Sequence, residues 1–307
     1  MSEAPPHALL RARIAVPFIV ISLIWGSTWL VILGQIDGTA PAWSVAGRFG
    51  VATIGAFVLA IATRSRLAIG AKAHRLAMVI GLFQFCANFN LVYPAELHLT
   101  SGIVAVMIAL IVIPNAVLGR LLLNQPITQR FVLGSVIAIA GIGLLLVNET
   151  RTARLGDDVG LGVILALGAM LAASVAGVIQ AGATGRSVPM PSLLAWSILY
   201  GAVFDFAFAW LVAGPPTFPT RWDYWAGLAY LGVFGSIVTF PLYWGLVREI
   251  GAGRAAYHGV LVVVIAMLLS TGFEGYRWSA LASAGSVLAL AGLVIALRAR
   301  NPALKSQ

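Results

Sequence analysis

Amide side chains stand inside a long apolar stretch of the sequence, FQFCANFNLVYPAEL at residues 83–97. A polar side chain at membrane depth is costly unless it is paired or faces a water-filled cavity. A helix turns by about 100° per residue, which puts Gln84 and Asn88 on one face and Asn90 and Tyr93 on roughly the opposite face. We predict that Gln84 and Asn88 bind substrate in a cavity, and that Asn90 and Tyr93 meet a neighbouring helix or the outer interface. Hydrogen bonding of Gln84 and Asn88 between helices, as structural glue, is the alternative.

Aromatic and hydroxyl residues form one stripe along the first long apolar segment. Ser22, Trp25, Thr28 and Trp29 share this stripe. Tryptophan is common at the two membrane interfaces, but Trp25 and Trp29 lie deeper, where an indole N–H needs a hydrogen-bond acceptor. We predict that Trp25 and Thr28 contact substrate.

The C-terminal half of the chain has a polar stripe of its own. Thr239 and Tyr243 share a helical face with Ser236, and Tyr257 and His258 open the next apolar segment. An imidazole can donate, accept or carry charge near neutral pH, which suits contact with a polar substrate or a gate. We predict that Thr239, Tyr243, Tyr257 and His258 bind substrate; a purely structural histidine is the alternative.

Two prolines interrupt apolar segments. Pro114 and Pro241 lack the N–H of a regular helix, and each frees a backbone carbonyl about one turn earlier. Membrane helices tolerate such breaks where a cavity or a neighbouring helix satisfies the freed group. We predict hinges for alternating access at both prolines, with static kinks as the alternative.

Arg48 and Asp205 are charged residues placed inside apolar segments. Arg48 lies about two turns from a segment end, so it is expected to extend toward the interface or to hold a structural position. Asp205 is expected to pair with Arg48 or to take up protons. One carboxylate is too little to predict proton coupling.

The elements that must position these residues are transmembrane helices. Of the 307 residues, 60% are hydrophobic and only 9% are charged, whereas a soluble domain has roughly a quarter charged residues. Apolar runs of about 20 residues, long enough to span a bilayer, recur along the chain, and the short alternating segments of an outer-membrane barrel are absent. We predict an all-α integral membrane protein with ten transmembrane helices, at residues 14–33, 43–63, 76–95, 100–123, 131–148, 159–181, 191–213, 223–247, 255–273 and 278–297.

The basic residues predict how the chain is oriented in the membrane. With a cytoplasmic N-terminus, fourteen Lys and Arg residues fall in cytoplasmic segments and only Arg151, Arg154, Arg221 and Arg277 fall outside. Positive residues favour the cytoplasmic side, so both termini are predicted to be cytoplasmic. The net charge of +9 therefore reflects topology in a lipid bilayer, and no nucleic-acid partner is expected.

The sequence lacks the catalytic motifs that an intramembrane enzyme would need. We find no Gly-x-Ser-Gly site, no paired intramembrane aspartates, no His-Glu-x-x-His zinc helix and no phosphate-binding P-loop. The short loops leave no room for a soluble catalytic domain. We therefore do not expect an enzyme, a catalytic residue, a bound metal or a cofactor. Cys86 is the single cysteine, so an intramolecular disulfide is excluded.

The chain contains a repeated segment. GSVIAIAG at 134–141 and GSVLALAG at 285–292 match at six of eight positions, 151 residues apart. At the same offset, Thr100-Ser101-Gly102 corresponds to Gly251-Ala252-Gly253. We predict two five-helix repeats, 14–150 and 151–298, between cytoplasmic tails 1–13 and 299–307. Five is odd, so the second repeat is inverted, as in many secondary transporters. Chance similarity between apolar segments is the alternative.

The two spans that carry this repeat have few polar side chains. Their glycines and alanines recur at spacings that permit close helix packing, which predicts a scaffold role and allows for a subunit contact. The protein is expected to be a monomer or a weak homo-oligomer.

Several short motifs resemble the EamA-type half of the drug/metabolite transporter (DMT) superfamily. They are WGSTWL at 25–30, Arg48 in the second span, LNQPIT at 123–128 and REIGAGRAA at 248–256. The resemblance covers nearly the whole chain as two halves, and it is strongest to bacterial YddG-type aromatic amino acid exporters. Asn124-Gln125 replaces a Gly-Glu pair usual in the family, which is expected to affect loop packing only. The resemblance implies a multi-pass protein of the bacterial inner membrane.

The predicted cavity is nearly uncharged and is lined by amides, hydroxyls and aromatic rings. Such a cavity suits a small zwitterion with an apolar or aromatic side chain, and the resemblance implies export of amino acids. We predict a secondary transporter that exports amino acids, aromatic or neutral, and related small metabolites from the cytoplasm by alternating access. Efflux of lipophilic cations such as methyl viologen, through cation–π contacts, is the alternative, although buried carboxylates are scarce.

Overall fold

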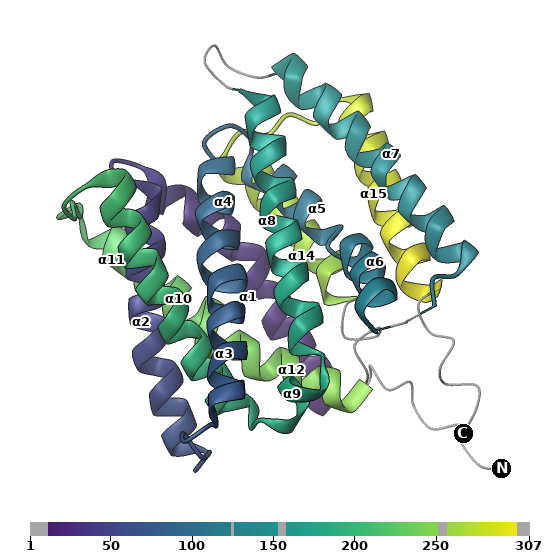
Figure 1. The fold of residues 1–307 in the computed structure, drawn as a ribbon. Coiled ribbons are helices and arrows are strands. Elements are labelled where there is room, and N and C mark those ends of the chain that lie inside the picture. Colours follow the sequence, from purple (N-terminus) through teal and green to yellow (C-terminus); the bar gives the residue numbers. More distant parts are fainter. Residues whose placement is uncertain (1–11, 124–125, 153–157, 251–256, 300–307) are drawn as a thin grey trace.

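The computed structural model describes residues 12–123, 126–152, 158–250 and 257–299 (Figure 1). Within these ranges every regular element is a helix. The helices are α1 (Ala12–Ile36), α2 (Pro41–Ala62), α3 (Ala71–Ile80), η2 (Gly81–Ala87), α4 (Asn88–Ala95), α5 (Ser101–Ala109), α6 (Val112–Leu123), α7 (Gln129–Thr152), α8 (Val159–Gln180), α9 (Ala183–Ser187), α10 (Met190–Ala213), α11 (Trp222–Gly232), η3 (Val233–Val238), α12 (Thr239–Ile250), α14 (His258–Phe273) and α15 (Ala280–Ala299).

The described chain has the helices of a multi-pass membrane protein. Nine helical segments of this part are long and apolar enough to cross a membrane, and α14 is a shorter apolar helix of 16 residues. They fall where the ten spans were predicted, so the all-helical prediction is confirmed for the described residues. Some of the predicted features lie outside the described ranges. They are residues 1–11 and 300–307 of the predicted tails, Asn124-Gln125, and residues 251–256, which include Gly251-Ala252-Gly253.

Two of the spans change from α to π winding along their length. The third span is the stack α3, η2 and α4, and the eighth is the stack α11, η3 and α12. In the third span, Asn88 Nδ2 donates to the Gln84 carbonyl at 3.3 Å, and in the eighth Thr239 Oγ1 donates to the Gly235 carbonyl at 3.0 Å. These two pairs are also 151 residues apart. π turns are rare in proteins overall, but those that occur are often found at functional sites.

The fourth span is broken between α5 and α6, close to Pro114. Because proline has no N–H, the Leu110 carbonyl one turn earlier has no α-helical donor. The Ile113 N–H donates to it instead, at 2.8 Å, in a tighter turn. Pro241 lies directly after η3, at the third residue of α12. Both predicted hinge prolines therefore sit beside irregular winding, while their motion remains a prediction.

The helices α7 and α15 form a close antiparallel pair at one edge of the bundle (Figure 1). Gly134 lies against the backbone of Gly292, and Gly141 lies against the backbone of Gly285 and Ala289. A Cβ atom at Gly141 would lie 2.3 Å from the Ala289 nitrogen. These glycines therefore let the two helix backbones touch, as small residues do between membrane helices.

Gly141→Ala is expected to destabilise the protein by about 1–3 kcal/mol, because main-chain atoms of α15 occupy the place of the new methyl group. Gly143→Ala, two residues further along α7, is the matched control, since a Cβ there meets nothing within 4 Å. At that position the better helix propensity of alanine should raise the free energy of unfolding by roughly 0.5–1 kcal/mol. Thermal unfolding of the purified variants measures both effects. Equal Tm values for the two variants would contradict the close packing.

Candidate functional site

A cavity of about 930 Å³ lies among the helices. Its walls come from α1, α2, the third-span stack, α5, α6, α7, α8, α10, the η3–α12 stack, α14 and α15. Ile127 is among its lining residues and is 39% exposed, so the cavity meets the surface at that end. Most of the lining is apolar, as in ligand cavities generally, and among the described lining residues none is Asp or Glu.

One wall of the cavity is aromatic. Trp25 of α1 packs against Phe240 and Tyr243 of α12 and against His258 of α14, with ring centroids 5.7, 5.5 and 5.0 Å apart. Tyr243 and His258 are also 5.0 Å apart. The Trp25 indole N–H donates to the Gly235 carbonyl at 3.2 Å, which fixes the ring against η3. The first span thus builds one aromatic surface together with the eighth and ninth spans.

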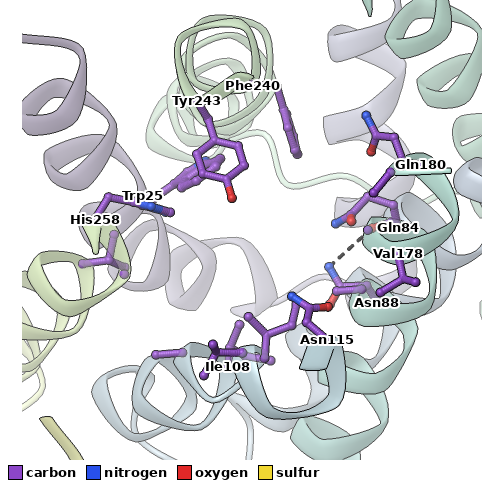
Figure 2. A pocket seen from close by; sticks show the side chains of 18 of the residues that line it. Trp25, Gln84, Asn88, Ile108, Asn115, Val178, Gln180, Phe240, Tyr243 and His258 are labelled. Carbon is purple, nitrogen blue, oxygen red and sulfur yellow. Dashed lines mark hydrogen bonds between the residues drawn. The ribbon is translucent and has the colours of Figure 1, made fainter. Parts of the chain in front are cut away.

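The facing wall carries amides. Gln84, Asn88, Asn115 and Gln180 come from η2, α4, α6 and α8, and all line the cavity. Figure 2 shows these side chains gathered across the open space from Trp25, Phe240, Tyr243 and His258. Asn115 is held by Ser174 of α8, whose hydroxyl donates to Asn115 Oδ1 at 2.7 Å. The two walls offer a ligand an apolar side and a hydrogen-bonding side.

A buried arginine lies deep in the lining. Arg48 of α2 is 2% exposed, and its guanidinium carbon lies 4.4 Å from the centre of the Phe89 ring. Its Nη1 donates to the Tyr93 hydroxyl at 3.4 Å. Thus Arg48 does not extend toward the interface; it is buried in the bundle and faces the cavity.

Six of the predicted substrate contacts line this cavity: Trp25, Thr28, Gln84, Asn88, Tyr243 and His258. Thr239 does not line it, because it is fully buried and its hydroxyl caps the π turn at the Gly235 carbonyl. Tyr257 does not line it either. It packs against an apolar cluster that includes Val112 and Phe131. Substrate binding by the six residues remains a prediction.

The other face of the third span meets neighbouring helices, as expected for Asn90 and Tyr93. Asn90 Nδ2 donates to Asp205 Oδ1 of α10 at 2.7 Å. Tyr93 is fully buried and accepts the hydrogen bond from Arg48 of α2. Asp205 is therefore bonded to an amide and not paired with Arg48.

Sequence reasoning did not assign Asn115, Gln180, Phe240 or Arg48 to the site. Asn115 had a signal, since it is an amide beside a helix-breaking proline inside an apolar run. Gln180 is the last residue of α8 and Phe240 is one aromatic residue among many, so no feature of the sequence marked either as a cavity residue. For Arg48 the sequence predicts extension toward the interface or a structural position, because the packing of α2 beside η3 that brings it to the cavity is a tertiary contact.

Carboxylates seal the end of the cavity away from Ile127. Ser101 begins the fourth span and Ile127 follows it, so the two mark opposite ends. Glu274, just after α14, accepts hydrogen bonds from the Ser101 hydroxyl and, at 3.0 Å, from the Ser101 N–H. Glu149 accepts the Thr100 N–H at 2.9 Å. The N-terminus of α5 is thus held by negative charge, which the helix dipole favours.

Glu96, at the same end, is 4% exposed, and its two carboxyl oxygens find no hydrogen-bond partner among the described residues. Burial raises its pKa well above the ordinary value of 4.5, and the negative charge of Glu274 raises it further, while the nearby Arg48 lowers it. The fold therefore favours the neutral, protonated form of Glu96 in this conformation.

We expect the stability of this sealed conformation to fall as the pH rises. A raised pKa gives stability that is complete below pH 4.5 and is lost as the pH rises through the higher pKa. Glu96→Gln mimics the protonated carboxyl, so it should remove this loss. The measurement is Tm between about pH 5 and pH 9, and the wild type should fall below Glu96→Gln as the pH rises. Parallel pH profiles would mean that Glu96 keeps an ordinary pKa.

Apolar helices long enough to cross a membrane, arranged around a central cavity, define a multi-pass membrane protein. The chain belongs to the EamA-like transporter family, whose profile matches residues 13–147 and again residues 160–298. The predicted membership of this family is thus confirmed, and the profile matches the chain twice.

Several curated proteins are similar over most of their length. Protein PagO of Salmonella typhimurium is 24% identical over 94% of this chain and 92% of its own. The uncharacterized transporter YoaV of Bacillus subtilis is 21% identical over 83% of this chain and 86% of its own. The uncharacterized inner membrane transporter YedA of Escherichia coli K12 is 26% identical over 82% and 80%. These names carry no substrate, so the narrower likeness to aromatic amino acid exporters stays a prediction.

A solved crystal structure shares the fold. It superposes with a TM-score of 0.65 over 94% of this chain and 98% of that chain, at 18% sequence identity. At this identity the likeness concerns the fold alone.

Proposed function

We propose that this protein is a secondary transporter that exports amino acids, aromatic or neutral, and related small metabolites across the bacterial inner membrane. The observation that carries the proposal is the pair of facing walls in the cavity, one aromatic and one of amides (Figure 2). An aromatic amino acid has the same two sides. Its ring would stack on Trp25 and Tyr243, and its ammonium would find the amide oxygens of Gln84, Asn88 and Asn115.

We propose that the cavity opens to the cytoplasm in this conformation. The opening lies at the end with residues 126–128, and the loop 63–70 and the connection 181–189, which contains α9, lie at this same end. Arg64, Arg66 and Arg186 are in these loops. The preference of basic residues for the cytoplasmic side supports this orientation, with both termini in the cytoplasm. Closure of this end and opening of the Glu274 end would complete alternating access.

We propose two inverted repeats, 14–150 and 151–298. If the two halves are equivalent at an offset of 151 residues, Gly134 corresponds to Gly285 and Gly292 corresponds to Gly141. The contact of Gly134 with Gly292 then predicts a contact of Gly285 with Gly141, and both contacts occur. The helices α7 and α15 are antiparallel, so a twofold axis that exchanges them must be perpendicular to both helices. Such an axis inverts one half relative to the other. The protein is proposed to function as a monomer or weak homo-oligomer.

A second set of contacts supports the same exchange. A Cβ atom at Gly81 would meet the backbone of Ser197 and Gly201 on α10. A Cβ atom at Gly232, which is 151 residues later, would meet Arg48 and Val51 on α2. The two glycines begin or precede the π segments of the third and eighth spans. Each half thus packs its π-containing span on the second helix of the other half.

The second candidate function is efflux of lipophilic cations such as methyl viologen. The aromatic wall favours it, since Trp, Tyr and Phe rings attract cations through their faces. The lining opposes it, because the described lining residues include Arg48 and no carboxylate. We therefore rank it below amino acid export.

Counterflow in proteoliposomes tests the proposal. Purified protein would be reconstituted, and exchange of radiolabelled phenylalanine and threonine would be followed for the wild type, His258→Ala and Gln84→Ala. Specific uptake that is lost in the folded variants would support amino acid transport through this cavity. Uptake that survives both changes would move the site elsewhere. Methyl viologen transport without amino acid uptake would favour cation efflux.

A further inference from the structure

The buried guanidinium of Arg48 is short of hydrogen-bond acceptors. Among the described residues its one hydrogen bond goes to the Tyr93 hydroxyl, at the long distance of 3.4 Å, and its Nε has no partner. A guanidinium has five N–H donors and no acceptor. It is also always charged, so burying it without an anion is costly.

Neither of the neighbouring carboxylates supplies the missing anion. Asp205 accepts its short hydrogen bond from Asn90, and its other oxygen has no partner. Both carboxyl oxygens of Glu96 lack hydrogen-bond partners among the described residues, and burial favours the neutral form of this carboxyl group. In the described part of the chain, Arg48 therefore forms no ion pair with either carboxyl group and interacts with both only by longer-range electrostatics.

The guanidinium lies where the aromatic wall ends. Gly235, which has no side chain, separates them: a Cβ atom there would be 3.3 Å from Arg48 Nη2 and 3.1 Å from Thr28 Cγ2. The carbonyl of the same glycine accepts the Trp25 indole N–H. The residue 151 positions earlier is Gln84, so one half leaves a space where the other half has an amide.

A second donor that lacks an acceptor lines the same cavity. The Trp29 indole N–H is buried and has no hydrogen-bond partner among the described residues. The side chains of Arg48 and Trp29 can only donate hydrogen bonds, so a ligand group that satisfies them must be a hydrogen-bond acceptor. A carboxylate offers two oxygens to the planar fork of an arginine, and a single arginine matches its single charge.

We propose that Arg48 binds the carboxylate of the transported molecule, with the rest of that molecule directed along the aromatic wall. The inference rests on the proposed transport function and narrows its substrates to amphipathic carboxylates. It also assigns to Arg48 the discrimination against amines and lipophilic cations that lack a carboxylate. Arg48 is then a specificity-determining residue of the cavity.

Paired ligands that differ only at the carboxylate test this assignment. The pairs are phenylalanine with phenylalaninamide, and 3-phenylpropionate with 3-phenylpropionamide, and binding is measured by thermal stabilisation of the purified full-length protein. The wild type should prefer each acid over its amide by roughly 10- to 100-fold, as a hydrogen bond to a charged group would give. Arg48→Gln should reduce this preference to about onefold and leave amide binding nearly unchanged.

Two further variants separate binding from structure. Tyr93→Phe removes the hydrogen-bond partner that Arg48 has among the described residues and keeps the charge of Arg48, so it should retain the preference for acids. Arg48→Lys keeps the charge without the planar fork and should retain part of that preference. If Arg48→Gln does not fold, the comparison of Arg48→Lys with Tyr93→Phe provides the test.

The outcomes distinguish this inference from the broader proposal. An acid preference for 3-phenylpropionate that depends on Arg48, without phenylalanine binding, would refute amino acid export and support the role of Arg48. Phenylalanine binding that is equally strong in Arg48→Gln would overturn the role of Arg48 and leave amino acid transport standing. Failure of every carboxylate to stabilise the wild type would overturn the assignment as well.

Discussion

Trp25→Ala is expected to reduce counterflow of the substrate by about 100-fold or more. The Trp25 ring is the centre of the aromatic wall, in contact with Phe240, Tyr243 and His258. Each aromatic pair contributes about 0.5–1.5 kcal/mol beyond its buried area, and the bond to the Gly235 carbonyl adds about 1 kcal/mol. Three contacts and this bond therefore stabilise the aromatic wall by several kcal/mol, and without them we expect the wall to lose the shape that binds the substrate.

The loss must be separated from misfolding. Trp25→Phe keeps a ring in the wall but removes the indole N–H, and it should retain an intermediate rate. Trp222→Ala is the matched control, because Trp222 is 80% exposed at the start of α11 and does not line the cavity. Initial rates are compared per folded protein, measured by size-exclusion chromatography. A wild-type rate for folded Trp25→Ala would remove the aromatic wall from the site.

Glu274→Gln is expected to open the sealed end of the cavity. The carboxylate accepts two hydrogen bonds from Ser101, which is 1% exposed, and it ties the end of α14 to the start of α5. Hydrogen bonds to a charged group contribute about 1.5–3 kcal/mol, so their loss should shift a two-state equilibrium by roughly 10- to 100-fold toward the open form. The amide of glutamine keeps the size of the side chain while removing its charge.

Spin labels can report this opening. Leu97 and Arg277 are exposed near the sealed end and would carry the labels after Cys86→Ala removes the native cysteine. Glu274→Gln should add a longer distance to the distribution between the two labels. Asp223→Asn is the control at the same end, since its ion pair with Arg221 is exposed and such pairs contribute little. Identical distributions for both variants would mean that Glu274 does not hold the seal.

The sequence predicted the helical architecture well because membrane burial leaves long apolar runs that length and hydropathy can identify. It also identified Trp25, Gln84 and His258, since each is conspicuous within an apolar run. It was less able to choose between neighbours. Tyr257 and His258 are consecutive, so their side chains point about 100° apart and only His258 faces the cavity.

Other positions depended on features that periodicity does not encode. Thr239 follows a π turn, where the extra residue per turn shifts the helical face, and its hydroxyl is used within its own helix. Arg48 gained its place in the cavity from the packing of α2 against the eighth span. Gln180 needed the end of α8 to come beside the third span. These long-range placements are decided by tertiary contacts.

The glycine contacts between α7 and α15 have an evolutionary consequence. When a side chain clashes with another side chain, a second mutation can shrink the neighbour and restore the fit. At Gly141 the neighbouring atoms are the Ala289 nitrogen and the Gly285 carbonyl, which belong to the main chain and are the same whatever residue stands there. No compensating substitution exists, so lineages that descend from this sequence should keep these glycines while the cavity walls diversify around new cargo.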